Sequence, residues 1–124
     1  MSEFMEAGGL GMYPTLAFGL LLTGLGVAHA VRPGRRLMTL FIIHGFVVMA
    51  LGSLGTIMGF IQTFYAVPRL PEVEQYPTML MGLAESLHNL MLALIFIVLP
   101  TLILSAGALR AAIAAGREPK VAAA

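Results

Sequence analysis

The stretch GLAESLHNLMLALIFIVLPTLI, residues 82–103, is apolar along nearly all of its length and contains one acidic residue, Glu85. A run of about 20 mostly apolar residues is long enough for a helix to cross the hydrocarbon core of a bilayer. The stretch therefore predicts a membrane-spanning helix. The carboxylate inside it requires a separate explanation, because an unpaired charge in a membrane is costly.

The composition of the whole chain agrees with this prediction. Of 124 residues, 59% are hydrophobic and only 10% are charged, whereas a soluble domain carries roughly 25% charged residues. The net charge of +1 gives no basis for nucleic-acid binding. The absence of cysteine excludes disulfide and thiolate chemistry. We expect a single membrane domain, 1–124, in contact with the lipid bilayer.

Three apolar runs predict an all-α fold with three transmembrane helices. RPGRR, residues 32–36, contains a Pro-Gly turn and separates the first two runs. VPRLPEVEQYP, residues 67–77, contains three prolines and two glutamates and is predicted to be an aqueous loop before the third run. The later two runs have roughly thirty residues each, giving helices of about 45 Å that should tilt or project beyond the lipid. The expected spans are about 12–31, 37–66 and 78–110.

The basic residues predict the orientation. Six of the seven lie in 32–36 and in the C-terminal tail (Arg110, Arg117, Lys120). Under the positive-inside rule both segments should be cytoplasmic, which places the N-terminus and 67–77 outside. The segment before the first run is acidic rather than basic, which argues against a cleaved signal peptide.

The second run contains LGSLGTIMGFIQTF, residues 51–64, and a regular series of small residues. Gly45, Gly52, Thr56, Gly59 and Thr63 follow one another at spacings of seven, four, three and four, so they share one side of a helix. Small residues let another helix approach closely in lipid, which predicts packing through the three glycines. The hydroxyls of the two threonines could instead face a hydrated path, and the two roles are compatible.

Glu85 is followed by His88 at i+3 and Asn89 at i+4, which favours a shared polar face. Three roles stay open for this trio: hydrogen bonding between helices, an ion path, or metal binding. The Glu-x-x-His spacing also occurs in di-iron helix bundles. Such a site needs carboxylates from several helices, and the apolar runs contain no second acid.

We therefore predict no metal and no cofactor. The chain also lacks a P-loop, a dinucleotide-binding motif and a serine-hydrolase motif. An enzymatic activity is not expected.

The second and third runs together resemble the MotA/TolQ/ExbB proton-channel family. The family has a Leu-Gly stretch, Gly-Thr and a further glycine in one span, as LGSLGTIMGFIQTF does. Its third span opens with a Gly-Leu-Ala-Glu-Ser-Leu type of sequence and has a later proline. Gly82, Ala84, Glu85, Leu87 and Pro100 fit that pattern. Two departures are the short 32–36 segment in place of a large cytoplasmic domain, and Leu90 in place of a threonine.

The resemblance, which covers about 45–107, implies a homo-oligomeric ring, a pentamer, in a bacterial inner membrane. It implies a proton channel or stator-like subunit that couples ion flow to a single-span partner carrying an aspartate. Thr56, Thr63, Glu85, His88 and Asn89 are then the expected pore residues. The alternatives are a non-conducting membrane scaffold and, third, a metal or haem carrier.

Overall fold

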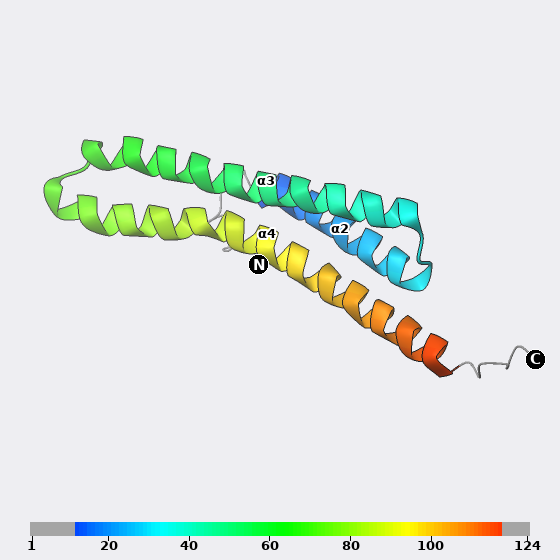
Figure 1. Ribbon diagram of the computed structural model, residues 1–124. Coiled ribbons are helices and arrows are strands. Elements are labelled where there is room, and N and C mark those ends of the chain that lie inside the picture. Colours follow the sequence, from blue (N-terminus) through cyan, green and yellow to red (C-terminus); the bar gives the residue numbers. More distant parts are fainter. Residues whose placement is uncertain (1–11, 118–124) are drawn as a thin grey trace, which may run out of the picture.

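The computed structural model describes residues 12–117, all in helices or short connections. Helix α2 spans Met12–Val31, α3 spans Arg35–Ala66 and α4 spans Glu72–Arg117, with a short 3-10 helix η1 at Val67–Arg69. Each of the three long helices is long and apolar enough to cross a membrane, which confirms the predicted all-helical class. Figure 1 shows α3 and α4 as a long hairpin with α2 packed along part of it.

The connections between helices are shorter than the sequence suggested. Helix α4 begins at Glu72 rather than near residue 78, so only residues 67–71 join it to α3. Glu72 and Glu74 lie in its first turn, where acidic side chains stabilise the positive end of the helix dipole. Gln75 Nε2 also donates to the Leu70 carbonyl at 2.9 Å. The two glutamates therefore mark a helix start rather than a loop.

Helix α4 contains two prolines, Pro77 and Pro100, and its C-terminal part diverges from α3 (Figure 1). Proline at position 100 has no N–H for the carbonyl four residues earlier, which weakens the helix locally. Pro100 is fully buried. A Cβ added at Gly26 of α2 would lie 2.9 Å from the Pro100 Cβ, so the proline packs directly on that glycine.

Contacts at glycines fix the register of the bundle. Along α3 and α4, Gly52 lies against Ala93 and Gly59 against Ser86, so these helices are antiparallel. Gly19 lies under the Phe96 ring, and Gly107 packs on Ala30. Helix α2 is therefore parallel to α4 with an offset of 77 residues (19 to 96, 30 to 107).

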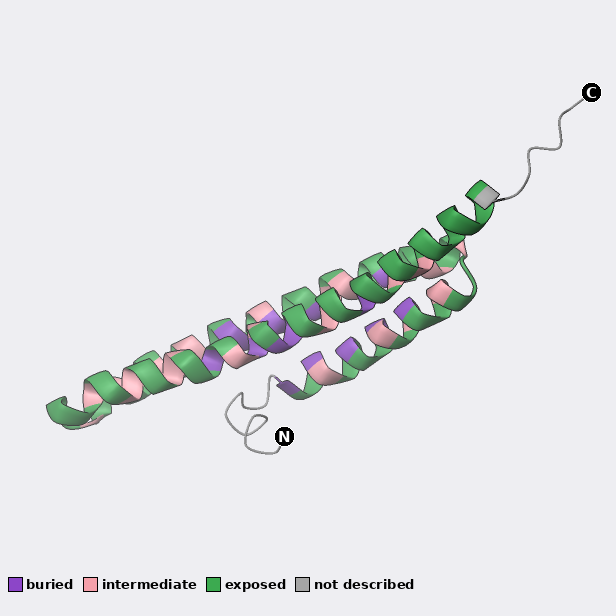
Figure 2. Ribbon diagram, turned by 90° about the horizontal axis from the view of Figure 1, so that it is seen from below, coloured by how far each residue is buried: buried purple, intermediate pink, exposed green. Residues whose placement is uncertain are grey.

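This offset places Met12, the first residue of α2, at the level of Asn89 on α4. Beyond that level α3 and α4 continue as a pair without α2, as Figures 1 and 2 show. We call this part the two-helix extension; it comprises residues 57–66 of α3, η1 and residues 72–88 of α4. Ten residues of α3 correspond to about 15 Å of helix.

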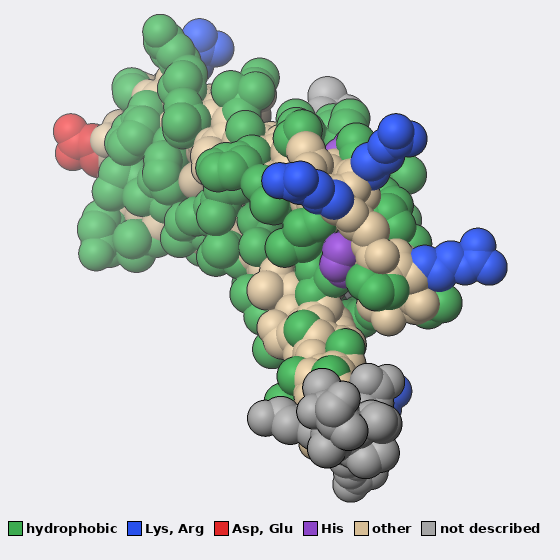
Figure 3. All heavy atoms as spheres, turned by 45° about the vertical axis from the view of Figure 1, so that its right-hand side comes forward, with side chains coloured by type: hydrophobic (Ala, Val, Ile, Leu, Met, Phe, Trp, Pro, Cys, Tyr) green, Lys and Arg blue, Asp and Glu red, His purple; other side chains and the backbone are tan. Residues whose placement is uncertain are grey.

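The core of the bundle is narrow, and most of the apolar surface is exposed (Figure 2). An exposed apolar surface this large is unfavourable in water and costs nothing in lipid. Basic side chains gather near one end of the molecule in Figure 3, where the turn between α2 and α3 lies. The buried hydrophobic residues are Met12, Leu22, Phe41, Val48, Leu92 and Ala93.

Candidate functional site

The contact between α3 and α4 is formed by small residues on both helices. A Cβ added at Gly52 would lie 3.0 Å from the Asn89 carbonyl oxygen, and one at Gly55 would lie 2.9 Å from the Asn89 Cγ. A Cβ at Gly59 would overlap Ser86. The helices are therefore as close as glycine permits. Gly52 and Gly59, two of the glycines in the predicted packing series, lie in this contact.

The first glycine of the predicted series does not belong to this contact. No heavy atom lies within 4 Å of a Cβ added at Gly45, whereas Gly55, which was not in the series, is buried against Asn89. Within the protomer, Gly45 therefore takes no part in the contact between α3 and α4. The C-terminal part of α4 diverges from α3 (Figure 1), so the close approach of the two helices ends before the level of Gly45.

Thr56 lies inside the protomer rather than on a hydrated path. Its side chain is 6% exposed, and its hydroxyl lies 2.9 Å from the Gly52 carbonyl and 3.1 Å from the Ser86 carbonyl of α4. Thr63 is half-buried, donates to the Gly59 carbonyl at 2.9 Å and contacts Gly82. Within one protomer both threonines serve the contact between α3 and α4.

Replacing Thr56 with valine should destabilise the hairpin by about 0.5–1.5 kcal/mol. The substitution preserves shape and removes one hydrogen bond between helices, and such bonds in membrane proteins contribute amounts of this size. Unfolding of the purified protein in mixed detergent micelles would measure the change. Thr101→Val is the matched control, since Thr101 is exposed and its hydroxyl donates to the Ile97 carbonyl of its own helix. Equal effects of the two variants would contradict the role of Thr56.

Glu85, His88 and Asn89 do not form one polar unit. Asn89 is 2% exposed and packs on Gly55 of α3, whereas the Glu85 side chain is exposed. His88 is half-buried, and its Nδ1 lies 2.9 Å from the Ala84 carbonyl rather than at the carboxylate. Residues four apart on a helix differ by only about 40° in direction, and the edge of the contact with α3 falls between them, covering Asn89 and leaving Glu85 exposed.

The remaining histidines lie far from this group. His44 Nδ1 is 3.0 Å from the Leu40 carbonyl, and its ring lies 6.3 Å from the ring of Phe18. His29 has a buried Nδ1 without a hydrogen-bond partner among residues 12–117. In that part of the chain, no group of three His, Asp or Glu side chains is placed to hold a metal ion.

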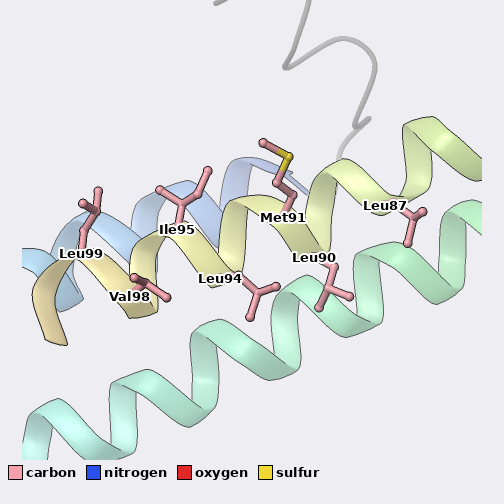
Figure 4. Close-up of a pocket in the computed structure, with 7 residues that line it drawn as sticks. All are labelled: Leu87, Leu90, Met91, Leu94, Ile95, Val98 and Leu99. Atoms are coloured by element: carbon pink, nitrogen blue, oxygen red, sulfur yellow. The ribbon is translucent and has the colours of Figure 1, made fainter. Parts of the chain in front are cut away.

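One surface pocket, with a volume of about 510 Å³, lies on α4 (Figure 4). Its lining residues all belong to α4 and are all apolar, so it offers no group for catalysis or for binding a charged ligand. In a bilayer this surface can be covered by lipid or by another helix. The lining residues are Leu87, Leu90, Met91, Leu94, Ile95, Val98 and Leu99.

The partner residues on α4 were not predicted as a set, although a signal exists. Gly82, Ser86, Asn89 and Ala93 recur at spacings of four, three and four, like the α3 series. Two helices with such matched spacing can pack along a common line. Glu85 carries the charge, but the smaller residue beside it, Ser86, makes the contact with α3.

Comparisons of the chain with protein-family models, with curated proteins and with solved structures found no match. The class of the protein therefore follows from its own fold. It is an all-helical protein with three helices long and apolar enough to cross a membrane.

Proposed function

We propose that the chain is a subunit of a homo-oligomeric ion channel or stator-like complex in a bacterial inner membrane. The observation that supports this is the position of Glu85, which lies on the surface of the protomer. A carboxylate next to lipid is costly, so it must face water or another subunit. In a ring, of which a pentamer is the expected form, copies of α4 would present Glu85 and His88 to a shared path.

The position of Glu85 along the helices fits the outer mouth of such a path. Arg35 and Tyr65 are thirty residues apart on α3, or about 45 Å, which matches a bilayer of about 40–45 Å with its headgroups. Arginines suit the cytoplasmic headgroups and exposed tyrosines suit the outer interface. Since Ser86 lies against Gly59, Glu85 falls about 8 Å inside the level of Tyr65. It would lie at the outer edge of the hydrocarbon core.

Proton flux into proteoliposomes tests the proposal. Glu85→Gln should lower the flux by about tenfold or more, because amide cannot exchange a proton. Glu74→Gln is the matched control, since Glu74 lies in the first turn of α4 outside the apolar run, and it should leave the flux unchanged. Equal flux in the Glu85→Gln variant and the unmodified chain would overturn the proposal. So would the absence of flux even with a co-expressed partner protein.

A non-conducting membrane scaffold is the second candidate, and the burial of Thr56 and Asn89 favours it. Two of the expected pore residues are used for packing within the protomer. The two functions differ in what occupies the axis of the assembly. A closed or lipid-filled centre, with Glu85 held between neighbouring helices, would support the scaffold.

A further inference from the structure

The side of the hairpin that faces α2 changes from apolar to polar where α2 begins. On α3, residues 41, 48, 55 and 62 recur at intervals of seven and so lie along one side. Phe41 contacts Gly26 of α2 and Val48 is buried, whereas Gly55 packs on Asn89 of α4. Gln62, the next member of this series, lies in the two-helix extension and is exposed.

Helix α4 shows the same change. Thr78, Glu85 and Leu92 are also seven residues apart and share one side. Leu92 is buried, and Phe96 one turn further packs on Gly19 of α2, so this side faces α2. Beyond the start of α2, the same side presents Glu85 exposed and Thr78 half-buried. Glu85 therefore continues the α2-facing side of α4.

Gln62 and Glu85 lie at nearly the same level of the extension, because Thr63 is against Gly82 and Gly59 is against Ser86. We call the strip formed by Gln62, Thr78 and Glu85 the extension slot. Beside this strip the extension has exposed apolar side chains, Phe64, Tyr65, Leu80 and Met81, whereas its charged residues Arg69, Glu72 and Glu74 lie at the turn of the hairpin. A polar strip between apolar surfaces is poorly suited to lipid, since buried polar groups need hydrogen-bonding partners.

We propose that the extension slot binds the end of a membrane helix from another protein, in line with α2, that carries a Lys or Arg opposite Glu85. The uncovered length of about 15 Å accommodates two to three turns of helix. The charge selects the occupant, because a carboxylate at the edge of the hydrocarbon core is best paired with a cation. An acidic helix, such as the aspartate-bearing partner that the family resemblance implies, would place like charges together.

Among residues 12–116, no Lys or Arg is placed to supply this cation. Residues 1–11 contain Glu3 and Glu6 and no Lys or Arg. Arg32, Arg35, Arg36 and Arg110 lie towards the opposite end of the helices, and Arg69 lies in η1 at the turn of the hairpin. The inference goes beyond the proposed ion path, since the slot would bind such a helix whether or not ions pass.

Site-directed crosslinking in liposomes tests the slot. The chain has no native cysteine, so a Gln62→Cys variant reports on the slot alone. The probe is a synthetic single-span Leu/Ala helix with one Lys two turns from its end and one neighbouring Cys. This peptide should crosslink at least about fivefold faster than the same peptide with Leu or Asp in place of Lys. The preference should disappear when Glu85→Gln is added and persist when Glu74→Gln is added instead.

Leu80→Cys is the control for position, because Leu80 is exposed elsewhere on the extension. The slot would be established if the peptides crosslink little at Leu80→Cys and the lysine peptide crosslinks fastest at Gln62→Cys. Equal crosslinking of the three peptides would overturn the proposal, and so would a lysine preference that survives Glu85→Gln. Crosslinks between two copies of the chain at residue 62 in place of the peptide would assign the slot to a second copy and would likewise overturn it. None of these outcomes depends on proton flux.

Discussion

Gly52→Ala should destabilise the protein by about 1–3 kcal/mol, although alanine is the better helix former. The added Cβ would overlap the Ala93 Cβ and lie 3.0 Å from the Asn89 carbonyl oxygen. Neither group can rotate away, so α3 and α4 must separate, and overpacking a close contact has a cost of this size. Separation would also strain the hydrogen bond from Thr56 to the Ser86 carbonyl. Unfolding in mixed micelles would measure the loss.

Gly45→Ala is the matched control on the same helix. A Cβ added at Gly45 meets no heavy atom within 4 Å, so only helix propensity changes. Alanine is favoured over glycine by up to about 1 kcal/mol in a helix, and this variant should be neutral or slightly more stable. Opposite signs for the two substitutions are the expected result. A destabilised Gly45→Ala variant, or an unaffected Gly52→Ala variant, would refute the assigned α3–α4 contact.

Gly26→Leu should detach α2 from the hairpin, with a cost of roughly 2–3 kcal/mol for overpacking a rigid contact. A Cβ at this position would lie 2.9 Å from the Pro100 Cβ and 3.4 Å from the Pro100 carbonyl oxygen. The proline ring is rigid, and α4 cannot yield locally without changing its bend. Helix α2 is shorter than the other two, so a single steric block removes a large share of its contact.

A disulfide between Cys residues introduced at Ala30 and Gly107 would report this detachment. A Cβ at Gly107 lies 3.3 Å from the Ala30 Cβ, close to the separation of about 3.5–4.5 Å found in disulfides. Gly26→Leu should slow the crosslinking by about tenfold, corresponding to at least about 1.4 kcal/mol. Gly24→Leu should leave the crosslinking rate unchanged, because no atom lies within 4 Å of a Cβ added at Gly24. Unchanged crosslinking in the Gly26→Leu variant would disprove the docking of α2 on Pro100.

The sequence predicted the helices well because their signal is local. Length and hydropathy place three spans, and the structure agrees except at the ends, where Glu72 starts a helix rather than continuing a loop. Of the glycines in the predicted series, Gly52 and Gly59 lie in the contact with α4. Gly45 has the same spacing and the same chemistry. Its exclusion follows from the bend of α4, which a periodic pattern on α3 does not contain.

The sequence alone could not predict how the polar residues between 85 and 89 are divided between neighbours. Spacings of three and four place Glu85, His88 and Asn89 on one broad side of a helix, which favours a shared site. The structure divides that side, because α3 covers Asn89 and leaves Glu85 exposed. A side as wide as this can meet two different neighbours. Which residue meets which neighbour depends on the rotation of the helix in the bundle.

Composition and periodicity by themselves determined that this protein is helical, suited to a bilayer and able to pack through small residues, since each property depends on residues close in sequence. Only the tertiary structure decided that α2 starts at the level of Asn89 and leaves Gln62 and Glu85 uncovered. That outcome depends on the offset between helices, which is set by the fit of Phe96 on Gly19 and of Pro100 on Gly26. These pairs are more than seventy residues apart in the sequence, and a contact over that distance is a property of the packed bundle.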